Sequence, residues 1–436
     1  ERWAEFQQDL RLFRAHMGKS RWGKMFMDHG FNATPVWLLL GNPIANAGGE
    51  HLLVDAANVN SPANLKGKPS KKHREIRKKF TQQKADLEER LGWLVLIDAL
   101  LYVLIFVMIW WAFGLEVCGV AMLIWSCGYP WHYDWTGGSF GRVPWLFMCT
   151  LSVCALKRGF SFIGGFALTW SMLLRLFPGA FIAGIVGKII MGGVDFLRKR
   201  QRHLMTRTHA MYTAGCTAAL IGLVLSSLAV VGNTSAYTEF WDNTMKHKGT
   251  KLTNHMGLPT MISWDPAHVG RKTKKSNLDD PWKEWKRHRS ENLKNRKWLH
   301  AAALITLFGM LMVIGRRRTD WEITALSSLM VVSAVELTCY YFTFFILMAP
   351  FAFKRTRYAV ILCLTPILSQ IIYLLPTWND ERYVNLSFLL YIALGLIVVS
   401  EFIDVAKALM SGRPKEQPRS NDSANSMSEA RAETPA

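Results

Sequence analysis

Residues 91–113 read LGWLVLIDALLYVLIFVMIWWAF, and Asp98 is the one charged residue in this run. A second run, MYTAGCTAALIGLVLSSLAVV at 211–231, carries no charged residue. Runs of about twenty apolar residues match the roughly 30 Å hydrocarbon thickness of a bilayer. Backbone groups in lipid have to be satisfied within their own segment, so such runs predict helices rather than open strands. The sequence therefore predicts an all-α fold, a polytopic transmembrane helical bundle.

Further apolar segments recur before, between and after these two runs. In the whole chain, 50% of the residues are hydrophobic and 19% are charged. Composition and hydropathy predict membrane segments near 92–113, 115–130, 143–157, 160–175, 177–193, 212–231, 298–315, 321–335, 340–353, 358–376 and 386–408. The chain then divides into an extracytoplasmic or interfacial first-loop module (1–91), transmembrane helices (92–232), a long extracytoplasmic loop (233–297), transmembrane helices (298–410) and a disordered cytoplasmic tail (411–436).

Basic clusters next to the ends of apolar segments give the orientation. They lie at 157–158, 198–202, 316–318 and 354–357. If all four are cytoplasmic, as the positive-inside tendency favours, the segments between them come in pairs. The polar stretches 131–142, 233–296 and 377–385 then lie outside, together with residues 1–91. Because the positive charge, +20 in all, is clustered beside apolar runs, it indicates membrane lipids or phosphates as partners rather than nucleic acid.

The predicted outer face gathers the residues that are candidates for chemistry. Arg175 and Glu336 each lie inside an apolar stretch, where an ionisable side chain is costly and commonly faces a cavity or a partner. A guanidinium at this depth is suited to a lipid phosphate, because it can hold two phosphate oxygens, or it snorkels to headgroups. The other candidates for substrate binding are His132, Asp134, Asn254, His255 and Tyr340. The alternative for each is an aromatic belt with solvated loop charges.

Metal and cofactor chemistry find no support in the sequence. The seven cysteines fall mostly inside or at the ends of apolar segments and form no Cys-x-x-Cys pair, so we interpret them as small buried apolar residues. There is no phosphate-cradling glycine loop and no His-Glu-x-x-His run. Residues 137–141 have the spacing Gly-x-Ser-x-Gly, but no strand is expected before them, so we interpret them as a turn rather than a nucleophile elbow. We therefore expect no metal and no cofactor.

Several local patterns occur in an order that resembles the GT-C superfamily of polyprenyl-phosphate-dependent glycosyltransferases, most closely its bacterial mannosyltransferase-like branch. Gly138–Trp145 is loosely similar to a loop of that branch, with departures at Arg142 and Trp145. The patterns that carry the resemblance are Lys157-Arg158-Gly159, Gly164-Gly165, Leu174-Arg175-Leu176-Phe177-Pro178, Trp241-Asp242-Asn243, Asn254-His255-Met256-Gly257-Leu258 and Asp9-Leu10-Arg11-Leu12-Phe13.

The resemblance implies transfer of a sugar from a polyprenyl-phosphate-linked donor to an acceptor on the extracytoplasmic face of a bacterial inner membrane, as part of cell-envelope assembly. It also implies that Asp9, in the first outer loop, is the general base, and that a membrane helix precedes Glu1. Cationic residues would stabilise the departing lipid phosphate. Two other classes stay open. A transporter would also place ionisable residues between helices, and a membrane scaffold would need no chemistry.

Overall fold

The computed structural model describes residues 33–46, 92–133, 141–199, 205–277 and 280–411, together with four single residues between 78 and 89. Nearly all regular structure in these ranges is helical, so the predicted all-α class is confirmed. The exception within the described chain is a two-stranded antiparallel ladder of β1 (His255–Met256) and β2 (Leu337–Thr338).

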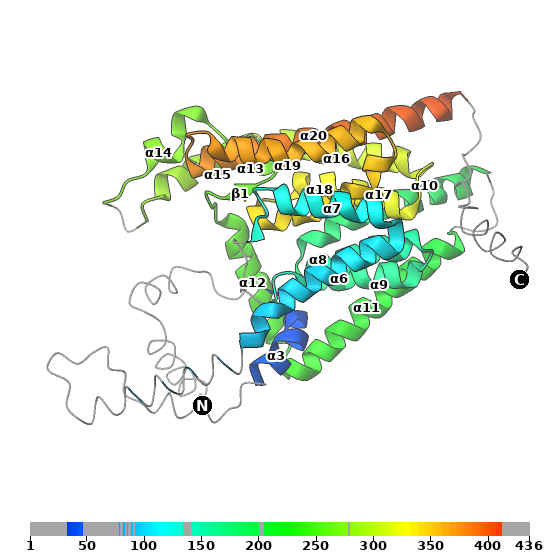
Figure 1. Cartoon of the computed structure of the whole chain (residues 1–436), viewed down its shortest axis with the longest axis horizontal. Helices are drawn as coiled ribbons and strands as arrows, with labels where there is room; N and C mark the ends of the chain where they lie inside the picture. Colours follow the sequence, from blue (N-terminus) through cyan, green and yellow to red (C-terminus); the bar gives the residue numbers. More distant parts are fainter. Residues whose placement is uncertain are drawn as a thin grey trace, which may run out of the picture.

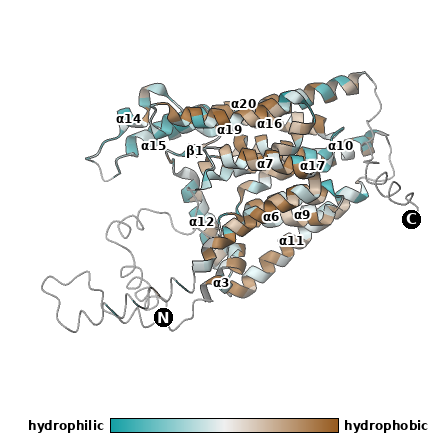
Figure 2. Cartoon of the chain, in the orientation of Figure 1, coloured by the Kyte–Doolittle hydropathy of each residue, from teal (hydrophilic) through white to brown (hydrophobic). Residues whose placement is uncertain are grey.

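Six helical stretches in the described residues are long and apolar enough to cross a membrane, which indicates a multi-pass membrane protein (Figure 2). They are η3–α6 (Gly92–Leu94 and Val95–Phe113), η5–α10 (Phe177–Ile182 and Ala183–Lys199), α11 (Arg207–Val231), α16 (Lys297–Gly315), α19 (Thr356–Leu374) and α20 (Asn379–Met410). Shorter apolar helices complete the bundle: η1 (Pro35–Trp37), α3 (Leu38–Asn46), α7 (Leu115–Cys127), α8 (Pro144–Lys157), α9 (Ser161–Leu174), α17 (Asp320–Leu326), α18 (Ser328–Ala334) and η7 (Cys339–Phe353).

Every apolar segment expected from the sequence coincides with one of these helices or with a consecutive pair of them. The largest difference is at α20, which begins at Asn379 rather than near 386. Asp380 and Glu381 lie in its first turn, where acidic side chains complement the positive end of the helix dipole. Hydropathy alone missed this turn because it is polar, although its charges favour a helix start.

The described residues of the four basic clusters, at 157–158, 198–199, 316–318 and 354–357, lie at one end of the bundle, here called the inner end (Figure 1). Ion pairs between two of these clusters and neighbouring acids bind the inner turns together: Arg316–Asp195, Lys354–Glu322, Arg318–Glu401 and Arg355–Asp404. Lys188 of α10 adds a further pair with Asp320. Lys157 reaches the same region, with its ammonium 5.5 Å from the ring centre of Trp321. A single end for all four clusters agrees with the pairing of helices expected from the sequence.

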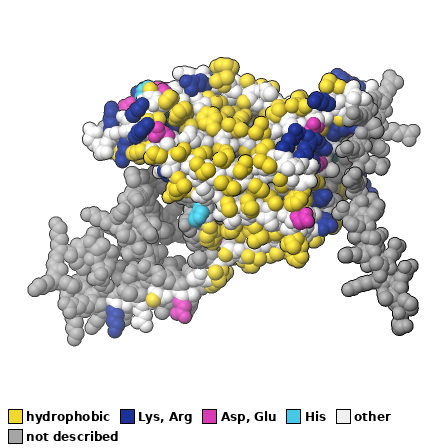
Figure 3. Space-filling model, turned by 45° about the horizontal axis from the view of Figure 1, so that its top comes forward, with side chains coloured by type: hydrophobic (Ala, Val, Ile, Leu, Met, Phe, Trp, Pro, Cys, Tyr) yellow, Lys and Arg dark blue, Asp and Glu magenta, His cyan; other side chains and the backbone are white. Residues whose placement is uncertain are grey.

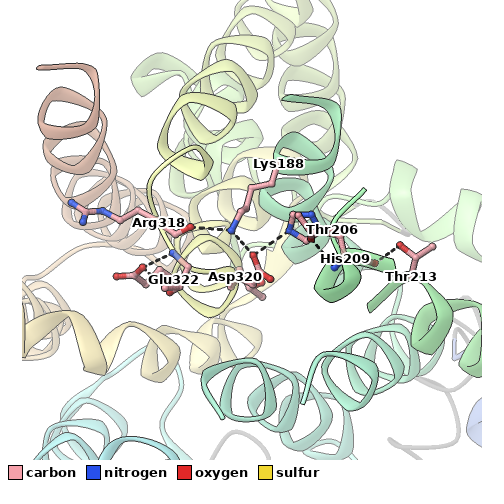
Figure 4. A network of polar contacts seen from close by, with 9 residues as sticks. Lys188, Thr206, His209, Thr213, Arg318, Asp320 and Glu322 are labelled. Atoms are coloured by element: carbon pink, nitrogen blue, oxygen red, sulfur yellow. Dashed lines mark hydrogen bonds and ion pairs between the residues drawn. The ribbon is translucent and has the colours of Figure 1, made fainter. Parts of the chain in front are cut away.

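One inner network joins three helices through a shared carboxylate (Figure 4). The Asp320 side chain of α17 pairs with Lys188 of α10 and lies 3.4 Å from Nε2 of His209 on α11. Lys188 also donates a hydrogen bond of 2.9 Å to the carbonyl of Arg318. The Lys188 and Asp320 side chains are only 13% and 14% exposed, so their pairing is what offsets the desolvation of the two charges.

The opposite end of the bundle, here called the outer end, carries a polar cap. Most of the segment 233–297, which the sequence predicts to be a long loop, forms this cap. Its elements are α12 (Ser235–Gly249), β1, α13 (Leu258–Ser263), η6 (Pro266–His268), α14 (Gly270–Thr273) and α15 (Lys283–Asn295). Figure 3 shows charged side chains gathered near both ends, with a broad hydrophobic surface between them. Such a band, with charges confined to its two edges, is the surface that a bilayer requires.

Helices α9 and α11 pack backbone against backbone through two glycines, here called the glycine seam. A side chain at Gly165 would collide with the carbonyl of Tyr212, and one at Gly215 would collide with the carbonyl of Phe162. Small residues allow membrane helices to pack backbone against backbone, where dispersion rather than water drives association. This glycine seam fixes the position of α9, and with it the position of Arg175, which caps its outer end.

Candidate functional site

The β1–β2 ladder brings together four of the residues that the sequence singles out. His255 faces Thr338 across the ladder, and the backbone N–H of Cys339 donates to the carbonyl of Asn254 at 3.2 Å. Glu336 and Tyr340 lie just before and just after this strand. The cap and the turn between α18 and η7, far apart in the chain, therefore form one surface at the outer end.

A polar pocket lies beneath this surface. The Glu336 carboxylate pairs with the Lys251 ammonium, and Thr260 Oγ1 donates to its other oxygen at 3.3 Å. Both charged side chains are about nine-tenths buried, at 7% and 11% exposed. Glu336 is thus a buried acid with an ion-pair partner, as expected for an ionisable residue within an apolar stretch. The pocket is lined by Lys251, Leu252, Thr253, His255, Thr260, Trp285, Arg289, Glu336 and Asp380.

Two further buried charges in this pocket come from α15 and α20. Asp380 is 1% exposed, and its Oδ2 accepts hydrogen bonds from the Gly270 N–H at 2.8 Å and from Trp285 Nε1 at 2.9 Å. Arg289 is 5% exposed and donates to the Thr260 carbonyl at 2.7 Å. Burial lowers the pKa of Arg289, while the negative charges of Asp380 and Glu336 act in the opposite direction. These contacts fasten the cap to the first turn of α20.

His255 is a neutral imidazole in this setting. Burial is the main reason that its pKa falls from 6.5 to about 4; the negative charge of Glu336 opposes this shift and the positive charge of Lys251 adds to it. At neutral pH the ring therefore carries one donor nitrogen and one acceptor nitrogen rather than a positive charge. Such a group pairs with uncharged hydroxyls as readily as with ions.

A second feature of the outer end is a pair of arginines over two adjacent tyrosines, here called the arginine–tyrosine pair. The Arg142 guanidinium lies 5.1 Å from the ring centre of Tyr340, and the Arg175 guanidinium lies 5.9 Å from that of Tyr341. The two rings are 4.5 Å apart. Asp98, 2% exposed, positions Arg142 by accepting hydrogen bonds from its N–H at 3.4 Å and from the Gly141 N–H at 3.2 Å.

Arg142 and Tyr340 also line a second pocket, which reaches into the bundle between α6, α8 and η7. Its other walls are largely aromatic and apolar, and comprise Tyr102, Trp131, Val143, Trp145, Leu146 and Thr343. Trp145, Phe177 and Tyr341 pack against one another with ring centres 4.7–5.9 Å apart, which supports the Arg175 side of the site. The second pocket therefore combines aromatic walls with polar groups, and a cation lies at its rim.

The remaining predicted site residues are not brought into either pocket by the described structure. His132 is exposed and directly follows Trp131 of the second pocket. Asp9 and Asp134 lie outside the described residues.

Sequence reasoning missed Lys251, Arg289, Asp380 and Arg142 as members of the site. Lys251 and Arg289 are two of many basic residues in the cap, and no local pattern separates them from solvated charges. In the sequence, Asp380 is one acidic residue in the predicted outer stretch 377–385, and nothing there indicates that it is buried. Arg142 was treated as a departure from the family loop. Their contacts depend on the tertiary arrangement of segments that are distant in the sequence.

The described residues contain no group of three or more His, Cys, Asp or Glu side chains that could hold a metal ion. The arrangement offers instead a charge-balanced polar pocket beside a cationic, aromatic one.

No protein-family model, curated protein or solved structure matches this chain.

Proposed function

We propose that this chain is an integral membrane glycosyltransferase that moves a sugar from a polyprenyl-phosphate donor to an acceptor on the extracytoplasmic face of a bacterial inner membrane. The observation that carries the proposal is the arginine–tyrosine pair at the end of the bundle opposite the basic clusters. The positive-inside tendency assigns those clusters to the cytoplasm, so the arginines belong to the outer side.

The chemistry of the donor fits this pair of cations. When the bond between the sugar and the phosphate breaks, the departing polyprenyl phosphate gains negative charge. Guanidinium groups can each hold two phosphate oxygens, and stacking on tyrosine rings restricts their orientation in advance. Cations placed in advance where charge develops stabilise the transition state more than the ground state. The second pocket behind Arg142 is lined by the aromatic rings of Tyr102, Trp131 and Trp145, which belong to the same side of the site.

In the proposed reaction, one carboxylate acts on the side of the sugar opposite the phosphate. Asp9 accepts the proton of the acceptor hydroxyl, whose oxygen forms a bond to the anomeric carbon. The bond from that carbon to the phosphate oxygen breaks, and its electron pair leaves with the polyprenyl phosphate. A single displacement of this kind inverts the anomeric centre. The assignment of Asp9 rests on the family resemblance.

The experiment uses the full chain in its native membranes, which supply the acceptor, with polyprenyl-phosphate mannose and polyprenyl-phosphate glucose labelled in the sugar. We expect label from one donor to appear in a product that no longer carries the lipid phosphate. Arg142→Lys and Arg175→Lys keep the charge but lose the planar fork, so each should lower kcat/KM by about tenfold or more.

Arg357→Lys is the matched control, because Arg357 lies 5.4 Å from the ring centre of Tyr358 at the inner end and should be dispensable for transfer. Parent-level use of the donor by Arg175→Ala and Arg142→Ala proteins would remove the basis of the proposal. Movement of either intact donor across the membrane without transfer would favour a transporter. A complete lack of both activities with both donors would favour a scaffold.

A further inference from the structure

The turn between α8 and α9 carries two neighbouring cations at the inner end, Lys157 and Arg158, here called the α8–α9 cation pair. Both residues are exposed, and no carboxylate of the described chain lies within ion-pair distance of either. Glu116, exposed in the first turn of α7 at the same end, pairs with neither of them. The part of the chain that the structure describes therefore does not neutralise these two charges.

Cations of two other inner clusters differ in this respect. Arg316 pairs with Asp195, and Lys354 pairs with Glu322. A cation that already has a carboxylate beside it gains less from an anion outside the protein, because the carboxylate repels that anion. The α8–α9 cation pair is free of this repulsion, so an anionic partner from outside gains more there.

Aromatic rings of α6 restrict the positions of both cations. The Arg158 guanidinium lies 5.3 Å from the ring centre of Trp111 and donates a hydrogen bond to the carbonyl of that residue, near the inner end of α6. The other N–H groups of the guanidinium remain for further acceptors. The Lys157 ammonium lies 5.9 Å from the ring centre of Phe113 and has no hydrogen-bond acceptor among the described residues. The pair thus offers several donors from a restricted position.

The α8–α9 cation pair lies at the inner edge of the apolar surface. Trp111 is close to the last residue of α6, a helix long and apolar enough to cross a membrane, and it is 44% exposed. Phe160 is 51% exposed and stacks on Trp111, with ring centres 6.3 Å apart. Exposed aromatic rings at the end of a membrane helix lie at the level of the lipid headgroups. The acceptors nearest to the cations at this level are lipid phosphates.

We infer that the α8–α9 cation pair binds the phosphate of an anionic phospholipid in the inner leaflet, whose acyl chains lie against Trp111 and Phe160. A zwitterionic lipid carries its own cation beside the phosphate, so it gains less from the pair. A soluble anion would gain the charge contacts but would leave the exposed rings without an apolar partner. The inference is independent of the proposed glycosyltransferase activity.

A photo-crosslinking reporter at the turn tests the inference. The full chain with Phe160→p-benzoylphenylalanine is placed in nanodiscs of equal amounts of phosphatidylglycerol and phosphatidylcholine, and captured lipids are identified by mass spectrometry. We expect capture of phosphatidylglycerol in excess. Lys157→Gln and Arg158→Gln in the reporter chain should each lower this excess by about fivefold, because each removes one cation near the membrane surface. Thermal unfolding in phosphatidylcholine nanodiscs checks that each variant is folded.

Arg316→Gln is the matched control. It also removes one positive charge at the inner end, but that charge is already paired with Asp195, so the excess should stay at the level of the reporter chain. Equal capture of the two lipids by the reporter chain would overturn the inference. An unchanged excess in the folded Lys157→Gln and Arg158→Gln proteins, or an equal loss in Arg316→Gln, would do so as well. Loss of phosphatidylglycerol capture on addition of millimolar sn-glycerol 3-phosphate would identify a soluble phosphate as the ligand and reject the lipid.

Discussion

His255 and Thr338 face each other across a two-residue antiparallel ladder that ties the outer cap to the turn before η7. The ladder places an imidazole from the cap beside a carboxylate, Glu336, from the membrane bundle. A change in the position of the cap is therefore transmitted directly to the buried ion pair of Lys251 and Glu336. The outer site depends on two segments that have to fold against each other before either is complete.

Topology can be tested with cysteines at two exposed basic positions. Lys275→Cys lies in the outer cap and Arg198→Cys lies at the inner end of α10. In intact cells an impermeant thiol reagent should label the first and not the second, because the bundle separates the two ends. The parent chain, with its native cysteines, is the background. Labelling of both positions from one side would contradict the pairing of helices.

The general base is testable by substitution of Asp9. Asp9→Asn keeps the shape of the side chain and removes the proton acceptor, so turnover should fall by roughly a hundredfold or more while donor binding stays nearly unchanged. Side-by-side turnover of Asp9→Asn, Asp28→Asn, Asp55→Asn and Asp134→Asn in membranes checks this. An active Asp9→Asn beside an inactive Asp134→Asn would move the base to the loop at 131–142.

His255 should make the protein less stable in acid. Its pKa is about 4 in the folded protein and near 6.5 when unfolded, so between these values only the unfolded chain binds the proton. The contribution of His255 to the free energy of unfolding is therefore complete above about pH 6.5 and is reduced by about 3 kcal/mol at pH 4. Thermal unfolding midpoints between pH 7.5 and 4.5 should show a smaller decline for His255→Gln than for the parent. The control, exposed His132→Gln, should decline as the parent does.

The glycine seam gives a prediction about stability. Gly165→Ala pushes a methyl group into the carbonyl of Tyr212, so α9 and α11 have to separate, with a loss of about 2 kcal/mol or more. Gly222→Ala, on an open side of α11 where nothing lies within 4 Å of the added carbon, should be neutral or stabilising by up to about 1 kcal/mol. Unfolding midpoints in nanodiscs compare the two, and equal effects would show that the seam is not tightly packed.

Hydropathy predicted the helices well because each transmembrane segment has to satisfy its backbone locally, so its signal lies within about twenty consecutive residues. The clustering of basic residues likewise indicated which turns lie at one end. The split of the segment at 321–335 into α17 and α18 was not foreseen. It occurs at Ser327, whose backbone N–H bonds to the carbonyls of both Ile323 and Thr324.

The site was predicted less completely, for a physical reason. Glu336 and Arg175 could be identified because a charge in an apolar run stands out against its neighbours. Lys251, Arg289 and Asp380 occur in polar stretches, where a buried charge and a solvated one look the same in the sequence. Only the tertiary contacts distinguish them: Lys251 pairs with Glu336, and Arg289 and Asp380 are buried where α13, α15 and α20 pack against one another.

The glycine seam also limits lateral passage through the bundle. Where two helices touch through their backbones, no lipid chain can pass between them, so the inner halves of α9 and α11 form a closed wall at residues 162–165 and 212–215. Arg175 lies ten residues beyond Gly165, at the opposite end of α9. On the proposed function, a membrane-borne donor therefore has to reach Arg175 by a path that does not cross this seam.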